Sequence, residues 1–136
     1  MATDEVMAVL DGDPYVANHP QSRPFWLAAA QGVFLLPRCR ACGQAHWYPR
    51  PFCPHCGSAP VEWQPASGFG TLHAFTTLRR VTPARIVAYV RLEEGPILLT
   101  NMVGCSIDDL RIGMGVQVTF EPAMEGRLVP VFRMTR

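Results

Sequence analysis

The stretch CRACGQAHWYPRPFCPHC, residues 39–56, decides how this chain is built, because it holds four of the five cysteines as two Cys-x-x-Cys pairs. Each pair runs into a glycine, Gly43 or Gly57, and glycine accepts positive φ without steric cost. The chain can therefore fold back so that backbone N–H groups point at the thiolates. Two such turns supply the four soft donors of a tetrahedral zinc site. The sequence predicts a structural Zn²⁺ held by Cys39, Cys42, Cys53 and Cys56.

Other uses of the paired cysteines fit less well. A thioredoxin-type redox site has a single pair at a helix start within an α/β pattern, and disulfides favour an oxidising compartment. Iron in a rubredoxin-like site stays open as an alternative, because four thiolates do not settle the metal. His46 or His55 could replace a cysteine as ligand, but the four cysteines already close the coordination sphere. A closed sphere predicts one structural, non-catalytic Zn²⁺ per chain.

Composition bounds the rest of the chain. Its 136 residues, with 13 prolines and 11 glycines, indicate one ordinary domain or two very small ones made of short elements. A formal charge of +1 gives no bulk electrostatic reason to expect nucleic acid or an anionic membrane. No apolar run is long enough for a transmembrane helix, and the N-terminus lacks the basic region of a secretory signal. We expect a cytoplasmic chain with no membrane partner.

The segments around the cysteines suggest short elements. Residues 1–20 are expected to be irregular or weakly helical. The stretch SRPFWLAAAQG, residues 22–32, predicts a short helix with Ser22 as N-cap and Gly32 at its end. Residues 33–38, VFLLPR, predict a strand that leads into the first cysteine turn, whereas residues 59–70 are expected to be a connector.

Strand-like composition begins after residue 70. Five runs, 71–80, 85–94, 96–104, 116–121 and 127–134, are rich in β-branched, aromatic and aliphatic residues and are separated by turn residues. Five short strands fit a small antiparallel barrel of the OB (oligonucleotide/oligosaccharide-binding) type, with an SH3-like barrel as the alternative. The predicted fold is mainly β: an N-terminal helical segment (1–34), a rubredoxin-like zinc ribbon (35–63) and a five-stranded OB-fold barrel (64–136).

Catalytic signatures are missing from the sequence. It has no Gly-x-Ser-x-Gly elbow, no P-loop and no dinucleotide-binding glycine motif. Cys105 stands alone and is expected to be a small buried apolar residue rather than a nucleophile. We therefore predict no catalytic residue, and we do not expect the chain to be an enzyme on its own.

Two groups of residues are candidate contacts for a ligand or partner. Phe25 and Trp26 lie near the start of the predicted helix, where they could pack on the chain's own body or meet a partner protein. Arg79, Arg80 and Arg85 flank Pro83 between two strand runs. Guanidinium groups suit the phosphates of a nucleotide-like ligand, and a solvated loop is the alternative.

These segments, taken in order, resemble a known family. The helix with PFW, the four-cysteine ribbon, SGFGTLHAFTTL, VAYVRLEEGPILLTNMVG, LRIGMGVQVTFE and LVPVFR together are similar to a zinc-ribbon plus OB-fold family first catalogued as a domain of unknown function. The likeness runs from about Ser22 to Arg133. It implies a small non-catalytic subunit beside a thiolase-like or ketosynthase-like enzyme, which carries out condensation, thiolysis, acyl transfer or retro-aldol cleavage of acyl-CoA. The cysteines match the metal positions, and no catalytic residue carries over.

Three functions remain open at this point. The resemblance favours an accessory subunit of a thiolase-superfamily enzyme, with acyl-CoA at the shared interface. A free-standing acyl-CoA-binding protein would use the arginines to hold the nucleotide phosphates. A single-stranded nucleic-acid-binding OB protein rests on fold analogy alone, and the nearly neutral chain argues against it.

Overall fold

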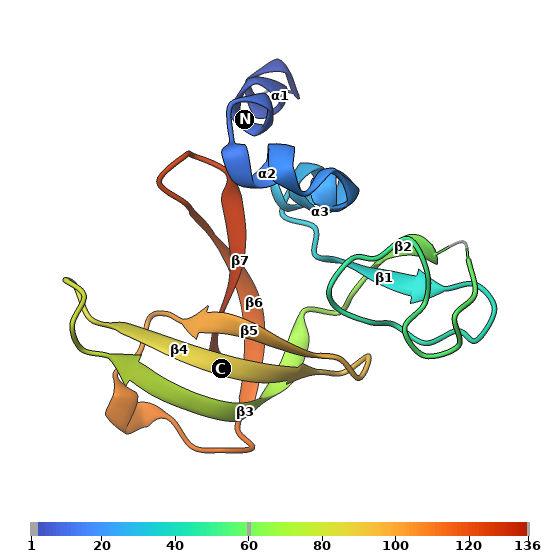
Figure 1. Cartoon of the computed structure of the whole chain (residues 1–136). Helices are drawn as coiled ribbons and strands as arrows, with labels where there is room; N and C mark the ends of the chain where they lie inside the picture. The colour runs from blue at the N-terminus through green and yellow to red at the C-terminus, as the bar shows by residue number, and fades with distance from the viewer. Residues whose placement is uncertain (1–2, 60, 136) are drawn as a thin grey trace. The chain divides into compact units, whose positions relative to one another are not determined.

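The computed structural model describes residues 3–59 and 61–135, which form two compact units. The first unit runs to Ala66 and includes Phe120–Val129, and the second comprises Ser67–Thr119 with the residues from Pro130 onward. The predicted fold class is confirmed, since a short helical region, a four-cysteine ribbon and a closed five-stranded barrel follow one another along the chain (Figure 1). Within the described ranges, no helix has the length and apolar character needed to cross a membrane.

The N-terminal residues are more helical than predicted. Helix α1 (Thr3–Asp11) buries Val6 and Leu10, which lie four residues apart on one face. Helix α2 (Pro14–Asn18) follows at once, because the Asp13 carboxylate caps its N-terminus and accepts from the amide of Tyr15 at 2.9 Å. A proline at the first position of α2 suits a helix start.

The predicted helix around the PFW motif is present but begins differently. A 3₁₀ turn, η1 (Pro20–Ser22), precedes α3 (Arg23–Ala29). Ser22 occupies the N-cap position, yet its hydroxyl makes no capping bond; it donates to the His19 carbonyl and accepts from the Trp26 indole N–H at 3.2 Å. Gly32 follows the end of the helix at φ 76°, as expected of a helix-terminating glycine.

The ribbon contains a strand that the sequence interpretation missed. Strand β1 (Leu35–Cys39) pairs antiparallel with β2 (Val61–Pro65), with Pro37 opposite Trp63. Residues 61–65, which include Pro65, were expected to be part of the connector 59–70. In a two-stranded sheet every strand is an edge strand, and edge strands tolerate proline. Both ends of the ribbon are thus tied by one short ladder.

The second unit contains most of the barrel. The strands of the barrel are β3 (Phe69–Leu78), β4 (Arg85–Leu92), β5 (Ile97–Met102), β6 (Gly115–Pro122) and β7 (Leu128–Met134). A 3₁₀ turn, η2 (Ile107–Asp109), precedes β6. They close in the order β3-β4-β5-β7-β6, and β5 and β7 are parallel. This is the predicted five-stranded OB-type closure.

Alternation along β4 and β5 separates the barrel's interior from its outer face. Ala88, Val90 and Leu92 are buried on β4, while the residues between them are exposed. At Gly70 of β3 the neighbouring strand β4 leaves no room for a side chain, because a Cβ there would lie 2.4 Å from the backbone oxygen of Arg91. Glycine at this position permits the close approach of two barrel strands.

Candidate metal centre

The four predicted ligands converge at one point of the first unit. All four sulfur atoms lie within 4.8 Å of one another. The Sγ atoms of Cys39 and Cys56 are 3.6 Å apart, and those of Cys42 and Cys53 are 3.7 Å apart. A tetrahedron with metal–sulfur bonds of about 2.3 Å has edges of about 3.8 Å. The cysteines therefore fit one tetrahedral metal ion.

The two cysteine turns have the same backbone hydrogen bonds. The Gly43 amide donates to the Cys39 carbonyl at 3.0 Å, and the Gly57 amide donates to the Cys53 carbonyl at 2.9 Å. Both glycines have positive φ, 76° and 77°. As the sequence suggested, this conformation turns backbone N–H groups toward sulfur: the Cys42 amide donates to Cys39 Sγ at 3.4 Å. Such bonds disperse the charge of metal-bound thiolates.

Neighbouring residues fix and tune the site. Cys39 ends β1 and is buried, as is Cys53, whereas Cys42 and Cys56 are exposed. Hydrogen bonds from the hydroxyl and amide of Ser58 lower the pKa of Cys56 to about 6. A thiol with that pKa is mostly thiolate at neutral pH, which is the form that binds metal.

Neither histidine of the segment joins the cysteines. Among the residues that the structure describes, the one group of metal-type side chains is the four cysteines. His46 is buried, and burial, followed by the charges of His55 and Arg50, lowers its pKa. His55 is exposed and contributes through its backbone, donating its amide to Cys53 Sγ at 3.3 Å.

The two aromatic residues of the PFW motif lie in the core of the first unit. Phe25 and Trp26 are 2% and 8% exposed. The Phe25 ring centroid is 4.8 Å from that of Trp47, in the loop between the cysteine turns, and 6.3 Å from that of Trp63 on β2. Phe25 therefore packs α3 against the ribbon, the first of the two alternatives that the sequence left open, and little of either ring is accessible to a partner.

The three candidate phosphate-binding arginines are exposed. Arg79 and Arg80 follow β3, and Arg85 is the first residue of β4. In the described part of the chain none of them forms an ion pair or a side-chain hydrogen bond. Their contact with a ligand remains a prediction, and they are free for one.

An ion pair that sequence analysis missed joins the N-terminal helices to the β6–β7 turn within the first unit. The fully buried Asp13 carboxylate accepts from Arg127 Nη1, and the Arg127 side chain is 14% exposed. The Arg127 guanidinium lies 4.8 Å from the Trp26 ring centroid, a cation–π distance. Asp13 before Pro14 signals a helix cap, but nothing in the sequence pairs it with a residue 114 positions away.

The pKa of Asp13 reflects two opposed effects. Burial raises this pKa. The hydrogen bond from Arg127, the hydrogen bond from the Tyr15 amide and the positive charge of Arg127 lower it by more than burial raises it, so the net pKa lies below the usual value. Asp13 is therefore ionised at neutral pH and acts as a cap and an ion-pair partner.

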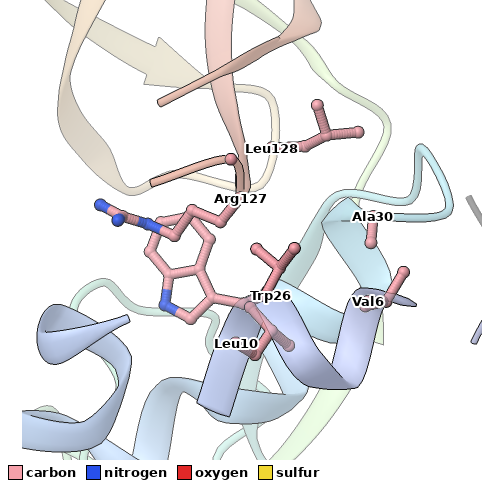
Figure 2. A pocket seen from close by; sticks show the side chains of 8 residues that line it. Val6, Leu10, Trp26, Ala30, Arg127 and Leu128 are labelled. Carbon is pink, nitrogen blue, oxygen red and sulfur yellow. The ribbon is translucent and has the colours of Figure 1, made fainter. Parts of the chain in front are cut away.

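A small depression lies beside this pair. Figure 2 shows the stem of Arg127 along the Trp26 indole, with Val6, Leu10, Ala30 and Leu128 around the opening. The enclosed space admits no more than about one water molecule. It is a packing defect rather than a site for an acyl chain.

Cys105 is half-buried in the second unit. Burial, and then the negative charge of Asp109, raise the pKa of its thiol. A raised pKa leaves little thiolate at neutral pH, which makes this cysteine a poor nucleophile.

Known proteins match the chain over both of its parts. The model "ChsH2, rubredoxin-like zinc ribbon domain" matches residues 26–62, and "ChsH2, C-terminal OB-fold domain" matches residues 63–121. A chain of a solved structure described as "Ltp2-ChsH2(DUF35) aldolase" superposes with a TM-score of 0.73 at 34% identity, covering 83% of this chain and 93% of that one. A DUF35-family protein of unknown function from Sulfolobus solfataricus has the same fold, with a TM-score of 0.62 at 14% identity over 99% of this chain and all of that one.

Curated relatives carry two kinds of name. A "DUF35 domain-containing scaffold protein" of Methanothermobacter thermautotrophicus is 30% identical over 65% of this chain and 71% of its own length. A "Probable enoyl-CoA hydratase alpha subunit" of Thermomonospora curvata is 37% identical over 80% of this chain, which spans 36% of that longer protein. With four converging cysteines, a closed five-stranded barrel and matches to both domain models in order, this chain belongs to the ChsH2/DUF35 family of zinc-ribbon OB-fold proteins.

Proposed function

We propose that this chain is a zinc-binding, non-catalytic accessory subunit of a thiolase-superfamily enzyme that acts on acyl-CoA. The observation that carries the proposal is the 34% identical match over 93% of a chain in a structure described as the Ltp2–ChsH2(DUF35) aldolase. The scaffold and enoyl-CoA hydratase names of the curated relatives are consistent with it.

The chemistry of the described residues supports a non-catalytic role. The cysteine group is closed, because four thiolates occupy all four positions of a tetrahedral ion and leave none for water or substrate. Zinc bound there would hold β1, β2 and the intervening turns in one arrangement. The proposed parts are the helical segment (1–34), the ribbon (35–63) and the barrel (64–136), which together offer the catalytic subunit a preformed surface.

Co-expression with thiolase-superfamily proteins from the same genome, each tried as a candidate catalytic subunit, tests the proposal. Light scattering after size-exclusion chromatography should find a complex with about one zinc per small chain. Cys39→Ser should abolish complex formation rather than slow the partner's chemistry, because an incomplete sphere leaves the ribbon unfolded.

Cys105→Ser is the matched control, since it makes the same chemical change outside the metal group. It should retain both zinc and partner. A wild-type chain that stays monomeric beside every thiolase-superfamily candidate, or a zinc-free Cys39→Ser chain that still assembles, would contradict the proposal.

Free-standing binding of acyl-CoA is the second candidate, favoured by Arg79 and Arg80, which are exposed and form no ion pair with any residue that the structure describes. Calorimetry of the isolated chain with acetyl-CoA tests it. Arg79→Glu with Arg80→Glu should abolish the heat if these side chains hold the phosphates, and no heat from the wild type at millimolar ligand would exclude this candidate.

A further inference from the structure

The outer face of the barrel carries a continuous apolar surface on β4 and β5. Tyr89 and Leu99 are direct cross-strand partners, and 47% and 49% of their surfaces are exposed. Val87 lies next to Tyr89 on the same face of β4, with Asn101 as its partner on β5, and Ile97 lies next to Leu99 on β5, opposite Arg91. We call these four residues the β4–β5 face. Because Ala88, Val90, Leu98 and Thr100 already fill the interior side, the barrel itself does not need this second apolar surface.

Two cations frame this surface. Arg85 and Arg91 alternate with Val87 and Tyr89 on the exposed side of β4, and Arg91 is opposite Ile97 on β5. Neither arginine has an ion pair or side-chain hydrogen bond among the described residues. The nearest acidic residue along β4 is the exposed Glu93, in the turn beyond the strand. The face thus has an apolar centre and a positive rim that the chain leaves unneutralised.

The third strand of this sheet has no Asp, Glu, Lys or Arg, and its exposed His73 lies at a bulge in the pairing with β4. Opposite Tyr89 and Val87, β3 presents Ala74 and Thr76. Small, neutral side chains allow another surface to approach closely without desolvating a charge. The rim cations are therefore the main electrostatic feature that a docking surface must match.

We propose that the β4–β5 face docks the catalytic partner subunit through a surface of aliphatic residues flanked by carboxylates. The inference rests on the proposed function and names the part of this chain that would carry it. Tyrosine and arginine are enriched in protein interfaces, where an aromatic anchor is surrounded by polar groups. Carboxylates opposite Arg85 and Arg91 would supply the missing counter-charges and speed association.

Single-stranded nucleic acid is the competing occupant, because OB barrels use the equivalent face for it. Such binding stacks successive bases on aromatic rings along a basic groove. Among the four residues of the β4–β5 face Tyr89 is the single aromatic one, and the other three have aliphatic side chains that do not stack with bases. This composition favours protein.

A charge at the centre of the face tests the proposal. Leu99→Glu should weaken binding of the co-purified thiolase-like partner by at least about tenfold, because it buries a carboxylate against apolar and acidic groups. Ile112→Glu is the matched control: Ile112 is 64% exposed in the loop before β6, away from the face, and its variant should bind as the wild type does. Circular dichroism and zinc content establish that each variant is folded, and Leu99→Asn replaces Leu99→Glu if it is not.

The role of the two rim arginines is tested by measuring the rate of association with the partner. Arg85→Glu with Arg91→Glu should slow association and flatten its dependence on salt, whereas Arg85→Lys with Arg91→Lys should preserve both. Equal rates for all three proteins would overturn the electrostatic part of the proposal.

The outcomes distinguish failure of the docking face from failure of the accessory function. A wild-type chain that binds the partner, with a folded Leu99 variant that binds equally well, overturns the docking face and leaves the accessory function intact. A wild-type chain that does not bind its partner removes the accessory function and this inference together. Salt-sensitive binding of a fluorescent oligothymidine by the wild type, lost in Leu99→Glu, overturns the inference in favour of nucleic acid.

Discussion

Asp13 performs two structural roles with one carboxylate, as the cap of α2 and the partner of Arg127. Asp13→Asn can keep the cap but removes the buried counter-charge of Arg127, which then keeps only the longer contact with the exposed Glu125 at 3.5 Å. Removal of one member of a buried pair is strongly destabilising. We expect a loss of about 3 kcal/mol in the free energy of unfolding, measured by urea titration with tryptophan emission.

Asp11→Asn provides the matched control. Asp11 pairs with Arg23 at 2.8 Å, but its side chain is 65% exposed. Exposed pairs contribute little, so its loss should cost less than about 1 kcal/mol. Equal effects of the two substitutions would show that burial of the Asp13 pair carries no special weight.

The titration of Asp13 gives the sign of its pH dependence. Its pKa is lowered in the folded state, so its stabilisation is present above the unfolded-state pKa of about 3.9 and is lost as pH falls through the folded-state value. The Asp13 carboxyl ¹³C shift should stay constant between about pH 7 and pH 5. Arg127→Gln should bring an inflection into that window, because burial then acts without the cation. An inflection already present in the wild type would contradict the pairing.

At the scale of elements, two barrel strands approach each other closely at Gly70. A methyl group at this position meets the Arg91 backbone oxygen at 2.4 Å, and a backbone atom cannot move aside cheaply. Gly70→Ala should destabilise the protein by about 1–3 kcal/mol, as overpacking does, in thermal or urea unfolding.

Gly12→Ala is the comparison for Gly70→Ala. A Cβ on Gly12 finds its nearest neighbour at 3.5 Å, an ordinary contact, so this change should be within about 0.5 kcal/mol of neutral. A Gly70→Ala protein as stable as the Gly12→Ala protein would mean that the strands separate without cost.

Sequence patterns predicted some elements better than others. The five barrel strands and the cysteine turns could be found because strand-like composition between turn residues and the Cys-x-x-Cys-Gly pattern are local signals. Strand β2 was assigned to a connector, because a five-residue segment that ends in Pro65 carries a weak local signal and its pairing with β1 is not encoded locally. Ser22 was predicted to cap a helix, but its hydroxyl serves the Trp26 indole, a tertiary contact that no local pattern encodes. The Asp13–Arg127 pair was also missed because it is a tertiary contact, between residues 114 positions apart.

At the scale of the whole molecule, zinc should act on one unit only. The four cysteines of the metal group and the three tryptophans lie in the first unit, and most of the barrel forms the second. Removal of zinc with a chelator should shift tryptophan emission to longer wavelength, because Trp47 and Trp63 depend on the ribbon. Amide exchange in β3, β4 and β5 should stay slow. Loss of protection in those strands at the same chelator concentration would show that the units do not unfold separately.

The composition of the first unit has a consequence for synthesis on the ribosome. Both cysteine turns and both ribbon strands are encoded before residue 66, so the ribbon can take up its metal while the barrel is still being translated. The ion pair of Asp13 forms later than the ribbon, because Arg127 is added about 60 residues after the end of the ribbon, which takes several seconds at ordinary elongation rates. During that interval the nascent helices carry an acidic group without its cation. A ribosome stalled once the ribbon has emerged from the exit tunnel, but before Arg127 is added, would therefore present a metal-loaded but incomplete N-terminal unit that a chaperone or the assembly partner could still engage.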